Sequence, residues 1–460
     1  MDVTPTFLAL LLELRPVFTK PAFHLFGQIL AGWTLSCRHR FITECIFSSG
    51  NVGNGHWSRY HRFFSHGAWV LDHLCQAVVR LLVRLFAPAG DIELAGDDTL
   101  CRKRGLTLYG AGMHHDPLIS SRALKLVSWG HNWVVLCLIV ALPAWAPTKV
   151  FALPIAFRLY KNRQGLTKGK KKSKATPGGK RPKPEADPNH RTRPQLLVEL
   201  ITLVAQWFPD RHLVVTADSA YGGKSVLQHL PANVELISHV HPKGALYAPP
   251  PPRQPHQKGA GRKKGARLPP MAAWASDASR PWQVLRFDQF GLHAALQVKT
   301  QQALYYKAGK GRLLTIVLVR DAAGRRPDQM FYATCLDWSA RQILATYANR
   351  WAVEVTFENG KQHLGLEDPA NRLPKAVQRT APLALVLYSL IVAWFHASGH
   401  AHVQFPERPW YTRKQEPSFA DMLSTLRRLS WEEKVNHLLP QGTADKKLLA
   451  QMIDLATRAG

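Results

Sequence analysis

The spacing of hydrophobic residues divides the chain into a helical first part, a strand-rich middle and a helical end. Apolar side chains recur at three- and four-residue intervals in residues 7–14, 23–41 and 69–85, which predicts amphipathic helices. From residue 91 the apolar residues form short runs rich in β-branched and aromatic types, and such runs are typical of strands. We expect strands at residues 92–100, 106–115, 131–142 and 150–160.

Helices and strands alternate after residue 193. The pattern predicts a helix over 194–208, a strand over 211–218, a helix over 223–230 and a strand over 234–241. Four more strand-like runs follow between residues 281 and 335, and helices dominate from residue 339. In an α/β sheet, functional side chains gather at the carboxyl ends of the strands.

The order of these segments predicts an α/β catalytic core that a β-rich insertion interrupts, with an α-helical N-terminal domain and a helical C-terminal region. The expected parts are residues 1–88 (helical N-terminal DNA-binding domain), 89–235 (first part of the core), 236–337 (β-rich insertion), 338–398 (last part of the core) and 399–460 (helical C-terminal tail). Within the first part of the core, residues 161–193 are rich in Lys, Gly and Pro, which predicts a disordered basic loop.

The charge of the chain indicates a polyanionic partner. The 460 residues include 60 Lys and Arg against 31 Asp and Glu, a formal net charge of +29. Nucleic acid is the first candidate and an anionic membrane surface the second. The longest apolar runs, residues 133–146 and 381–395, are shorter than the roughly 20 residues of a membrane span. We therefore expect a cytoplasmic protein without membrane association.

A basic and aromatic segment lies between the second and third predicted helices. Residues 57–64 read WSRYHRFF and follow a turn rich in Gly and Asn. One interpretation is a helix–turn–helix with Arg59 and Arg62 facing DNA. The other is an ordinary amphipathic helix whose aromatic residues lie in the core. The six cysteines of the chain include no CxxC pair, so a zinc finger is not expected.

Acidic residues stand at the ends of two predicted strands, although acids are scarce in this chain. Asp218 follows the apolar run 212–215, and Asp97 and Asp98 lie near the end of the strand at 92–100. Because a strand alternates its faces, only one of Asp97 and Asp98 can point into a given site. A bound cation would offset the charge of Asp218 at a strand tip. Alternatively, Asp218 caps the N-terminus of the next helix.

The predicted helix after the β-rich insertion carries a third acid. At 100° per residue, four polar side chains fall within an arc of roughly 60° on one helix face: Tyr347, Arg350, Glu354 and Lys361. Glu358 projects near the same face, so helix geometry does not choose between it and Glu354. Carboxylates from distant parts of a chain can hold two divalent metals for phosphoryl transfer on a nucleic-acid backbone. Arg and Lys beside them can bind phosphate oxygens.

Three motifs together resemble the DDE transposases of bacterial insertion sequences, in the group with a β-strand insertion before the final Glu. The motifs are GDDT at residues 96–99, VVTADSAYGG at residues 214–223, and a Y-x2-R-x3-E-x6-K signature that begins at Tyr347. The resemblance covers roughly residues 90–395. The segment after the strand at 234–241 resembles the start of the family's insertion, although His241 or Lys243 stands where the family often has Arg.

The resemblance implies an RNase H-like core with a two-metal site that holds Mg²⁺, with Mn²⁺ as a substitute. The catalytic metal ligands that it implies are Asp97, Asp218 and Glu354, with Asp98 as the alternative to Asp97. The DNA-contacting residues that it implies are Tyr347, Arg350 and Lys361.

The same resemblance implies a transposase that binds double-stranded DNA, cleaves it at terminal inverted repeats and joins the freed ends to target DNA. A homodimer in the synaptic complex and a location on the bacterial nucleoid in the cytoplasm follow from the family. Two alternatives remain open: a nuclease of related fold without strand transfer, and a non-enzymatic nucleic-acid-binding protein. The terminal repeat, the target preference and a hairpin intermediate are not indicated by the sequence.

Two further groups of residues have a structural interpretation that the pattern favours. The run HHD at residues 114–116 is not expected to form one metal site, because neighbouring strand residues point to opposite faces. Trp129, Trp133 and Trp351 are expected in the core, although one aromatic residue in such an enzyme could stack on a flipped base.

Overall fold

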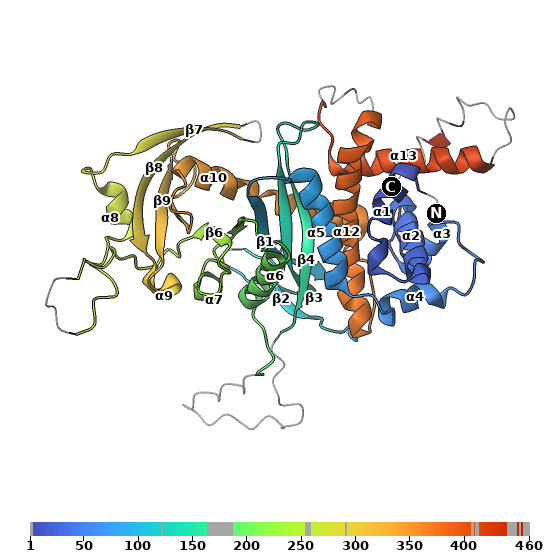
Figure 1. Ribbon diagram of the computed structural model, residues 1–460, viewed down its shortest axis with the longest axis horizontal. Helices are drawn as coiled ribbons and strands as arrows, with labels where there is room; N and C mark the ends of the chain where they lie inside the picture. The colour runs from blue at the N-terminus through green and yellow to red at the C-terminus, as the bar shows by residue number, and fades with distance from the viewer. Residues whose placement is uncertain are drawn as a thin grey trace.

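The computed structural model places the middle of the chain in one large mixed sheet with helices on both sides (Figure 1). It describes residues 3–438 apart from residues 122, 163–186, 254–258, 290–291, 406–408 and 410–413, together with residues 449, 452 and 453. Most of the basic loop expected at 161–193, and the last part of the tail expected at 399–460, lie outside the described residues.

The sheet has ten strands in the described part of the chain. They are β1 (Ile92–Arg102), β2 (Gly112–His115), β3 (Val127–Ala141), β4 (Val150–Tyr160), β5 (Leu213–Ala217), β6 (Val234–His239), β7 (Gln283–Gln289), β8 (Leu292–Leu304), β9 (Leu313–Asp321) and β10 (Gln329–Ala333). Their order is β2-β3-β1-β5-β6-β10-β9-β8-β7, and β4 also pairs with β3.

The strand directions divide this sheet into two regions. β1, β3 and β4 form an antiparallel series, whereas β5 is parallel to β1 and β6 is parallel to β5. β10 is antiparallel to β6, and β9, β8 and β7 follow as a second antiparallel series. The strands of the expected β-rich insertion therefore continue the core sheet across β6 and do not form a sheet of their own.

The strand expected at 106–115 is much shorter in the structure. Only Gly112–His115 is extended, and the preceding residues form turns. Gly110 adopts a φ of +74°, a left-handed conformation that glycine accepts at low cost and that interrupts a strand. The expectation of a strand over 106–115 is therefore wrong for its first six residues.

The helices occur in three groups along the chain. The first group is α1 (Pro5–Leu12), η1 (Arg15–Val17), α2 (Lys20–Leu35), α3 (Ile42–Ser48), α4 (Ser58–Ser65) and α5 (Leu71–Phe86). The second is α6 (Arg193–Trp207), α7 (Lys224–Leu227), α8 (Met271–Ser276) and α9 (Tyr306–Gly309). The third is α10 (Ala340–Asn349), α11 (Ala352–Leu364), α12 (Pro374–Ala397), η2 (Gly399–His402) and α13 (Phe419–Leu438).

One hydrophobic core joins the N-terminal helices to the rest of the chain. Buried residues from Phe7 to Leu426 belong to a single cluster, and α12 packs against α1, α4 and α5. Polar contacts reinforce this packing: the indole Nε1 of Trp33 donates to the Leu364 carbonyl at 2.8 Å, and the buried Arg379 donates to the Phe64 carbonyl at 3.0 Å. The N-terminal helices are therefore held against the helices that follow the sheet.

The helix α12 is longer than the apolar run at 381–395 from which it is expected. By length and composition α12 could cross a membrane, but 89% of its apolar window is buried inside the protein, which is typical of a core helix. Ser389 of α12 donates to the Pro154 carbonyl at 2.9 Å, and Thr356 of α11 donates to the Ala152 carbonyl at 2.8 Å. These contacts cover the free edge of β4, where a strand proline is tolerated.

Candidate active site

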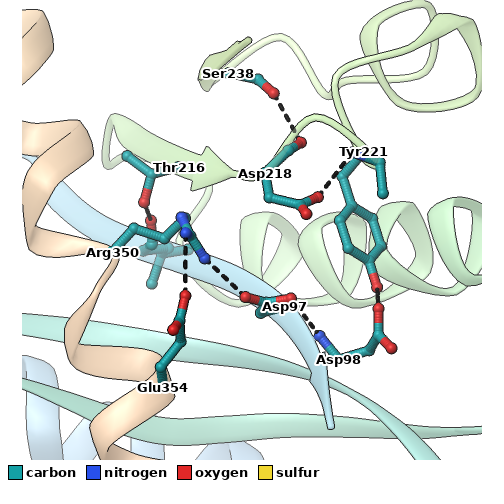
Figure 2. Close-up of polar contacts among 10 residues, drawn as sticks. Asp97, Asp98, Thr216, Asp218, Tyr221, Ser238, Arg350 and Glu354 are labelled. Carbon is teal, nitrogen blue, oxygen red and sulfur yellow. Dashed lines mark hydrogen bonds and ion pairs between the residues drawn. The ribbon is translucent and has the colours of Figure 1, made fainter. Parts of the chain in front are cut away.

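Two acids meet where the parallel pairing of β1 with β5 stops. β5 ends at Ala217, whereas β1 continues to Arg102, so Asp97 lies within β1 and Asp218 follows β5. The register pairs Gly96 with Ala217, so the next residues, Asp97 and Asp218, lie at the same level on neighbouring strands (Figure 2). This placement follows from the parallel pairing, because paired positions of adjacent strands lie side by side. Asp218 directly follows a strand, as the sequence predicts. The expectation that the first strand ends at its acids is wrong, because β1 continues along β3 to Arg102.

Asp97 and its neighbour Asp98 face opposite sides of the sheet. A Cβ added at Gly96 would lie 2.5 Å from Leu197 of α6, so the face with Gly96 and Asp98 packs against that helix. The face with Asp97 is turned toward α10 and α11, where Asp97 meets Arg350. Strand alternation thus separates the two acids, and only Asp97 shares a face with the residues of the Y-R-E-K signature.

Arg350 connects Asp97 to the third acid, Glu354. Its Nη1 donates to Asp97 Oδ2 at 2.8 Å, and its Nη2 lies 3.3 Å from Glu354 Oε1 (Figure 2). The side chains of Arg350 and Asp97 are 14% and 16% exposed, whereas that of Glu354 is 41% exposed. Glu358 is exposed, and Glu354 is the glutamate that this ion pair links to Asp97.

Burial dominates the electrostatics of Asp97. It raises the pKa of this carboxyl group to about 7, although the charge of Arg350 opposes the shift. Asp98 and Asp218 add a smaller upward effect because like charges disfavour a second anion nearby. A nearby cation therefore stabilises the ionised form of this carboxyl group.

The prediction of one continuous helix for the Y-R-E-K signature is wrong. Tyr347 lies on α10 and Glu354 on α11, and Arg350 and Trp351 form a turn between the two helices. Amide groups in this turn bond to carbonyls three residues back, as from Arg350 to Tyr347 at 3.1 Å and from Glu354 to Trp351 at 3.1 Å. This tighter winding changes the angle per residue, so the calculated arc does not describe the real arrangement. No Gly or Pro in this stretch signals the break.

Tyr347 lies beside a residue that sequence reasoning missed. The ring centroid of His239 is 5.0 Å from that of Tyr347 and 4.2 Å from that of Phe331. Thr216 of β5 pairs with Ile237 of β6 in parallel register. His239, the last residue of β6, therefore lies level with Asp218. Burial, followed by the charge of Arg350, lowers the pKa of His239. The signal available in the sequence was its place at a strand end.

Asp218 belongs to a tight turn and does not cap a helix. Its Oδ1 accepts a hydrogen bond from the Ala220 amide at 2.8 Å, and its carbonyl accepts one from Ser238 Oγ at 2.9 Å. α7 begins only at Lys224 and has Gly223 at its N-cap. The helix-cap alternative for Asp218 is therefore wrong.

The remaining signature residue, Lys361, is not joined to the acids. It is half-buried on α11, and no hydrogen bond or ion pair links it to Asp97, Asp218 or Glu354 among the described residues. His241 and Lys243 are exposed in the segment after β6.

Arg59 and Arg62 lie away from the acids, on α4, which packs mainly against α2, α3 and α12. The side chain of Arg62 is exposed, whereas Arg59 lies over the ring of Tyr60 at 5.0 Å. Tyr60, Phe63 and Phe64 are buried, as the amphipathic-helix interpretation expects. Residues 49–57 separate α3 from α4, which is longer than the turn of a helix–turn–helix.

The two structural interpretations made from the sequence have different outcomes. In the HHD run, His114 is buried and His115 is exposed on opposite faces of β2, and Asp116 pairs with Arg102 at 2.7 Å. Trp133 is buried as expected. Trp351 is 59% exposed, so the expectation of a core position for it is wrong.

The carboxylate oxygens of this site are the type of ligand that binds hard divalent cations. Mg²⁺ and Mn²⁺ prefer such oxygens. Burial disfavours the ionised form of Asp97, and a cation beside it would stabilise that form. As placed, no group of three or more His, Cys, Asp or Glu side chains in the described residues is arranged to hold an ion. Arg350 supplies the positive charge between Asp97 and Glu354, so metal binding would require this guanidinium to move.

Residues 48–305 match the family described as DDE superfamily endonuclease. The matched segment covers more than half of the 460 residues and includes Asp97 and Asp218, and it ends before α10 and α11. No curated protein matches this chain. The match indicates DNA as the class of substrate and phosphodiester cleavage as the class of reaction. On this evidence the chain belongs to the DDE superfamily of endonucleases.

Proposed function

We propose that this endonuclease is an insertion-sequence transposase with an RNase H-like core. It cuts DNA at the terminal inverted repeats of its element and joins the freed ends to target DNA. The observation that carries the proposal is the meeting of Asp97 and Asp218 on adjacent parallel strands, with Glu354 joined to Asp97 through Arg350.

The proposed metal ligands are Asp97, Asp218 and Glu354. Members of the family generally use divalent metal ions, and two bound Mg²⁺ ions would activate the attacking oxygen and stabilise the leaving oxygen. Asp97 is held within β1, and Asp218 is held by hydrogen bonds in the turn after β5. Glu354 is more exposed and stands at the start of α11. Glu354 is therefore the ligand with the most freedom to adjust when metal and DNA bind.

The cationic residues are proposed to bind the DNA backbone. Arg350 has a donor fork that suits phosphate oxygens once it leaves Asp97, and Tyr347 and Lys361 extend this surface along α10 and α11. Arg59 and Arg62 are proposed to contact DNA from α4, away from the chemical step. We also propose that the protein acts on nucleoid DNA in the cytoplasm and forms a homodimer when it pairs two transposon ends.

The test is a cleavage assay with the full chain and labelled DNA that carries the terminal repeats flanking its own gene. We expect cuts at the element boundary with Mg²⁺ and none with EDTA. Asp218→Asn and Glu354→Gln are expected to lose at least about 10³-fold in rate and to retain DNA binding. The matched control is Glu358→Gln, a change to an exposed glutamate on the same helix, which is expected to cut at the wild-type rate.

Strand transfer is tested separately with pre-cleaved ends and a supercoiled target plasmid. Joined products that require Mg²⁺ and Glu354 support the transposase. Efficient cutting without any joined product would favour the nuclease alternative. DNA binding without cutting in the wild-type protein would contradict both enzymatic readings.

A further inference from the structure

The second acid of the GDDT motif, Asp98, makes a contact that the proposed chemistry does not use. Asp98 Oδ1 accepts a hydrogen bond from the hydroxyl of Tyr221 at 2.5 Å (Figure 2). Tyr221 is fully buried, and burial followed by the charge of Asp98 raises its pKa, so the hydroxyl stays protonated and donates. This bond joins the middle of β1 to the turn that follows β5.

Asp98 is held on its other oxygen by two more donors. Its Oδ2 accepts from Asn132 Nδ2 of β3 at 2.8 Å and from Arg193 Nη1 of α6 at 2.8 Å. The carboxylate therefore has donors on both oxygens and a cationic partner, on the face of the sheet opposite to Asp97. Both oxygens accept hydrogen bonds from protein groups, so Asp98 connects β1 to β3, α6 and the turn that contains Tyr221.

Tyr221 belongs to the same tight turn as Asp218. The Tyr221 amide donates to the Asp218 carbonyl at 3.1 Å, and the Ala220 amide donates to Asp218 Oδ1 at 2.8 Å. Any displacement of the Tyr221 ring would therefore shift the backbone that orients the Asp218 carboxylate.

Other elements hold this turn from the opposite side. Ser238 of β6 donates to the Asp218 carbonyl at 2.9 Å, and Tyr332 of β10 donates to the Gly222 carbonyl at 2.9 Å. Gly222 approaches β6 so closely that an added Cβ would lie 2.5 Å from Ser238 Oγ. β6 and β10 thus fix the turn on one side, and the Asp98–Tyr221 hydrogen bond fixes it on the β1 side.

We propose that Asp98 is a positioning residue, which acts through Tyr221 to hold the turn of Asp218 at a set distance from Asp97. The inference rests on the proposed function, because it assigns Asp97 and Asp218 to the reacting centre. Asp98 and Asp97 are adjacent within β1, between the strands β3 and β5, so one strand carries one acid and anchors the turn that carries the other. Groups that orient metal ligands in this way usually change metal affinity or activity by 10- to 100-fold when removed.

The test combines three measurements on the full chain with Tyr221→Phe, which removes only the hydroxyl. We expect the rate of Mg²⁺-dependent DNA cleavage to fall roughly 10- to 100-fold and Mn²⁺ binding, measured by electron paramagnetic resonance, to weaken roughly tenfold. We also expect the Ala220 amide to exchange hydrogen faster, because its bond to Asp218 Oδ1 loses support. The double variant with Asp98→Ala should lose little more Mn²⁺ affinity than the larger of the two single losses, because both changes remove the hydrogen bond between Tyr221 and Asp98.

Tyr388→Phe is the matched control. Tyr388 is also buried, and it lies on α12, where it stacks on Phe419 at 4.3 Å and makes no hydrogen bond to the turn of Asp218 among the described residues. It should lose stability without any change in Mn²⁺ affinity or cleavage. Wild-type Mn²⁺ affinity and cleavage in Tyr221→Phe, or fully additive losses in the double variant, would overturn the positioning role. A wild-type protein that never cuts DNA, with faster Ala220 exchange in Tyr221→Phe, would contradict the proposed function while the restraint on the turn stands.

Discussion

Arg350 Nη1 lies 2.8 Å from Asp97 Oδ2, and the two residues are 253 positions apart in the chain. The same guanidinium reaches Glu354 Oε1 at 3.3 Å, so one cation serves two of the acids proposed to bind metal. Arg350 is the counter-ion of the buried Asp97. A metal ion bound at the proposed site would therefore compete with Arg350 for Asp97.

The first prediction tests this competition with Arg350→Gln. Removing the guanidinium removes a positive charge that repels the incoming cation, so Mn²⁺ should bind roughly tenfold more tightly, equivalent to about 1.4 kcal/mol. Titration followed by electron paramagnetic resonance at pH 8.5 measures the change. This pH is above the Asp97 pKa of about 7 in the wild-type protein, and loss of the Arg350 charge moves that pKa upward. DNA cleavage should nevertheless fall, because the phosphate-binding fork is lost.

Arg320→Gln is the control for this prediction. Arg320 pairs with Asp328 at 2.7 Å on the far part of the sheet, so its loss should leave Mn²⁺ binding unchanged. Unchanged or weaker Mn²⁺ binding in Arg350→Gln would show that Arg350 does not compete with metal for Asp97.

The second prediction concerns the space beside the Asp218 turn. In Gly222→Ala the new methyl group would lie 2.5 Å from Ser238 Oγ and 2.9 Å from the His239 carbonyl, so the turn must shift. We expect a loss of roughly 1–3 kcal/mol in the free energy of unfolding and a drop in cleavage of at least about tenfold. Urea unfolding and the cleavage assay measure the two effects.

The neighbouring glycine provides the comparison. A Cβ at Gly223 meets nothing within 4 Å, and its backbone is extended. Gly223→Ala should therefore retain both stability and cleavage. Equal losses in the two alanine variants would argue against steric displacement of the turn.

The third prediction concerns Asp116 and acid pH. Hydrogen bonds, first from Arg102 Nε at 2.7 Å and then from Ser128 Oγ at 2.6 Å, lower the pKa of Asp116 to about 2. A carboxyl group with a depressed folded-state pKa stabilises the fold above its unfolded pKa, near 3.8, and loses that contribution as the pH falls toward 2. Asp116→Asn should cost roughly 1–3 kcal/mol of unfolding free energy at pH 7.

The difference between the wild-type protein and Asp116→Asn should shrink as the pH is lowered from about 4 to about 2. Urea unfolding at a series of pH values measures it. Asp210→Asn, at an exposed aspartate, is the control and should show a small difference that does not change with pH. A constant deficit for Asp116→Asn across this range would mean that the loss comes from packing and not from the ion pair.

The fourth prediction concerns DNA binding by α4. Arg62 is exposed, so Arg62→Gln should weaken binding to all DNA sequences and lower the slope of log affinity against log salt by about 1. Fluorescence anisotropy at several salt concentrations measures this slope. Arg325→Gln, at an exposed arginine that already pairs with Asp321, should leave the slope unchanged. An unchanged slope in Arg62→Gln would remove α4 from the DNA-binding surface.

The sequence by itself determined the kind of segment at most positions. Periodicity is a local property, so it located the strands that became β1, β3, β4, β5 and β6 and the long core helix α12. It also placed Asp218 at a strand end, because an acid directly beside an apolar run is visible without knowledge of the fold. Asp97 lies within β1, since pairing with β3 extends that strand to Arg102. The excess of positive charge indicated a polyanionic partner, because net charge depends only on composition.

Tertiary structure decided which of these residues meet. The choice between Asp97 and Asp98 depends on which face of β1 packs against α6, and that packing is a long-range property. The break between α10 and α11 lies at Arg350, whose side chain donates to Asp97. No Gly or Pro in this stretch predicts the break. His239 entered the site only because β6 is in parallel register with β5. Spacing along a chain specifies local geometry, whereas register and packing depend on contacts between segments far apart in the sequence.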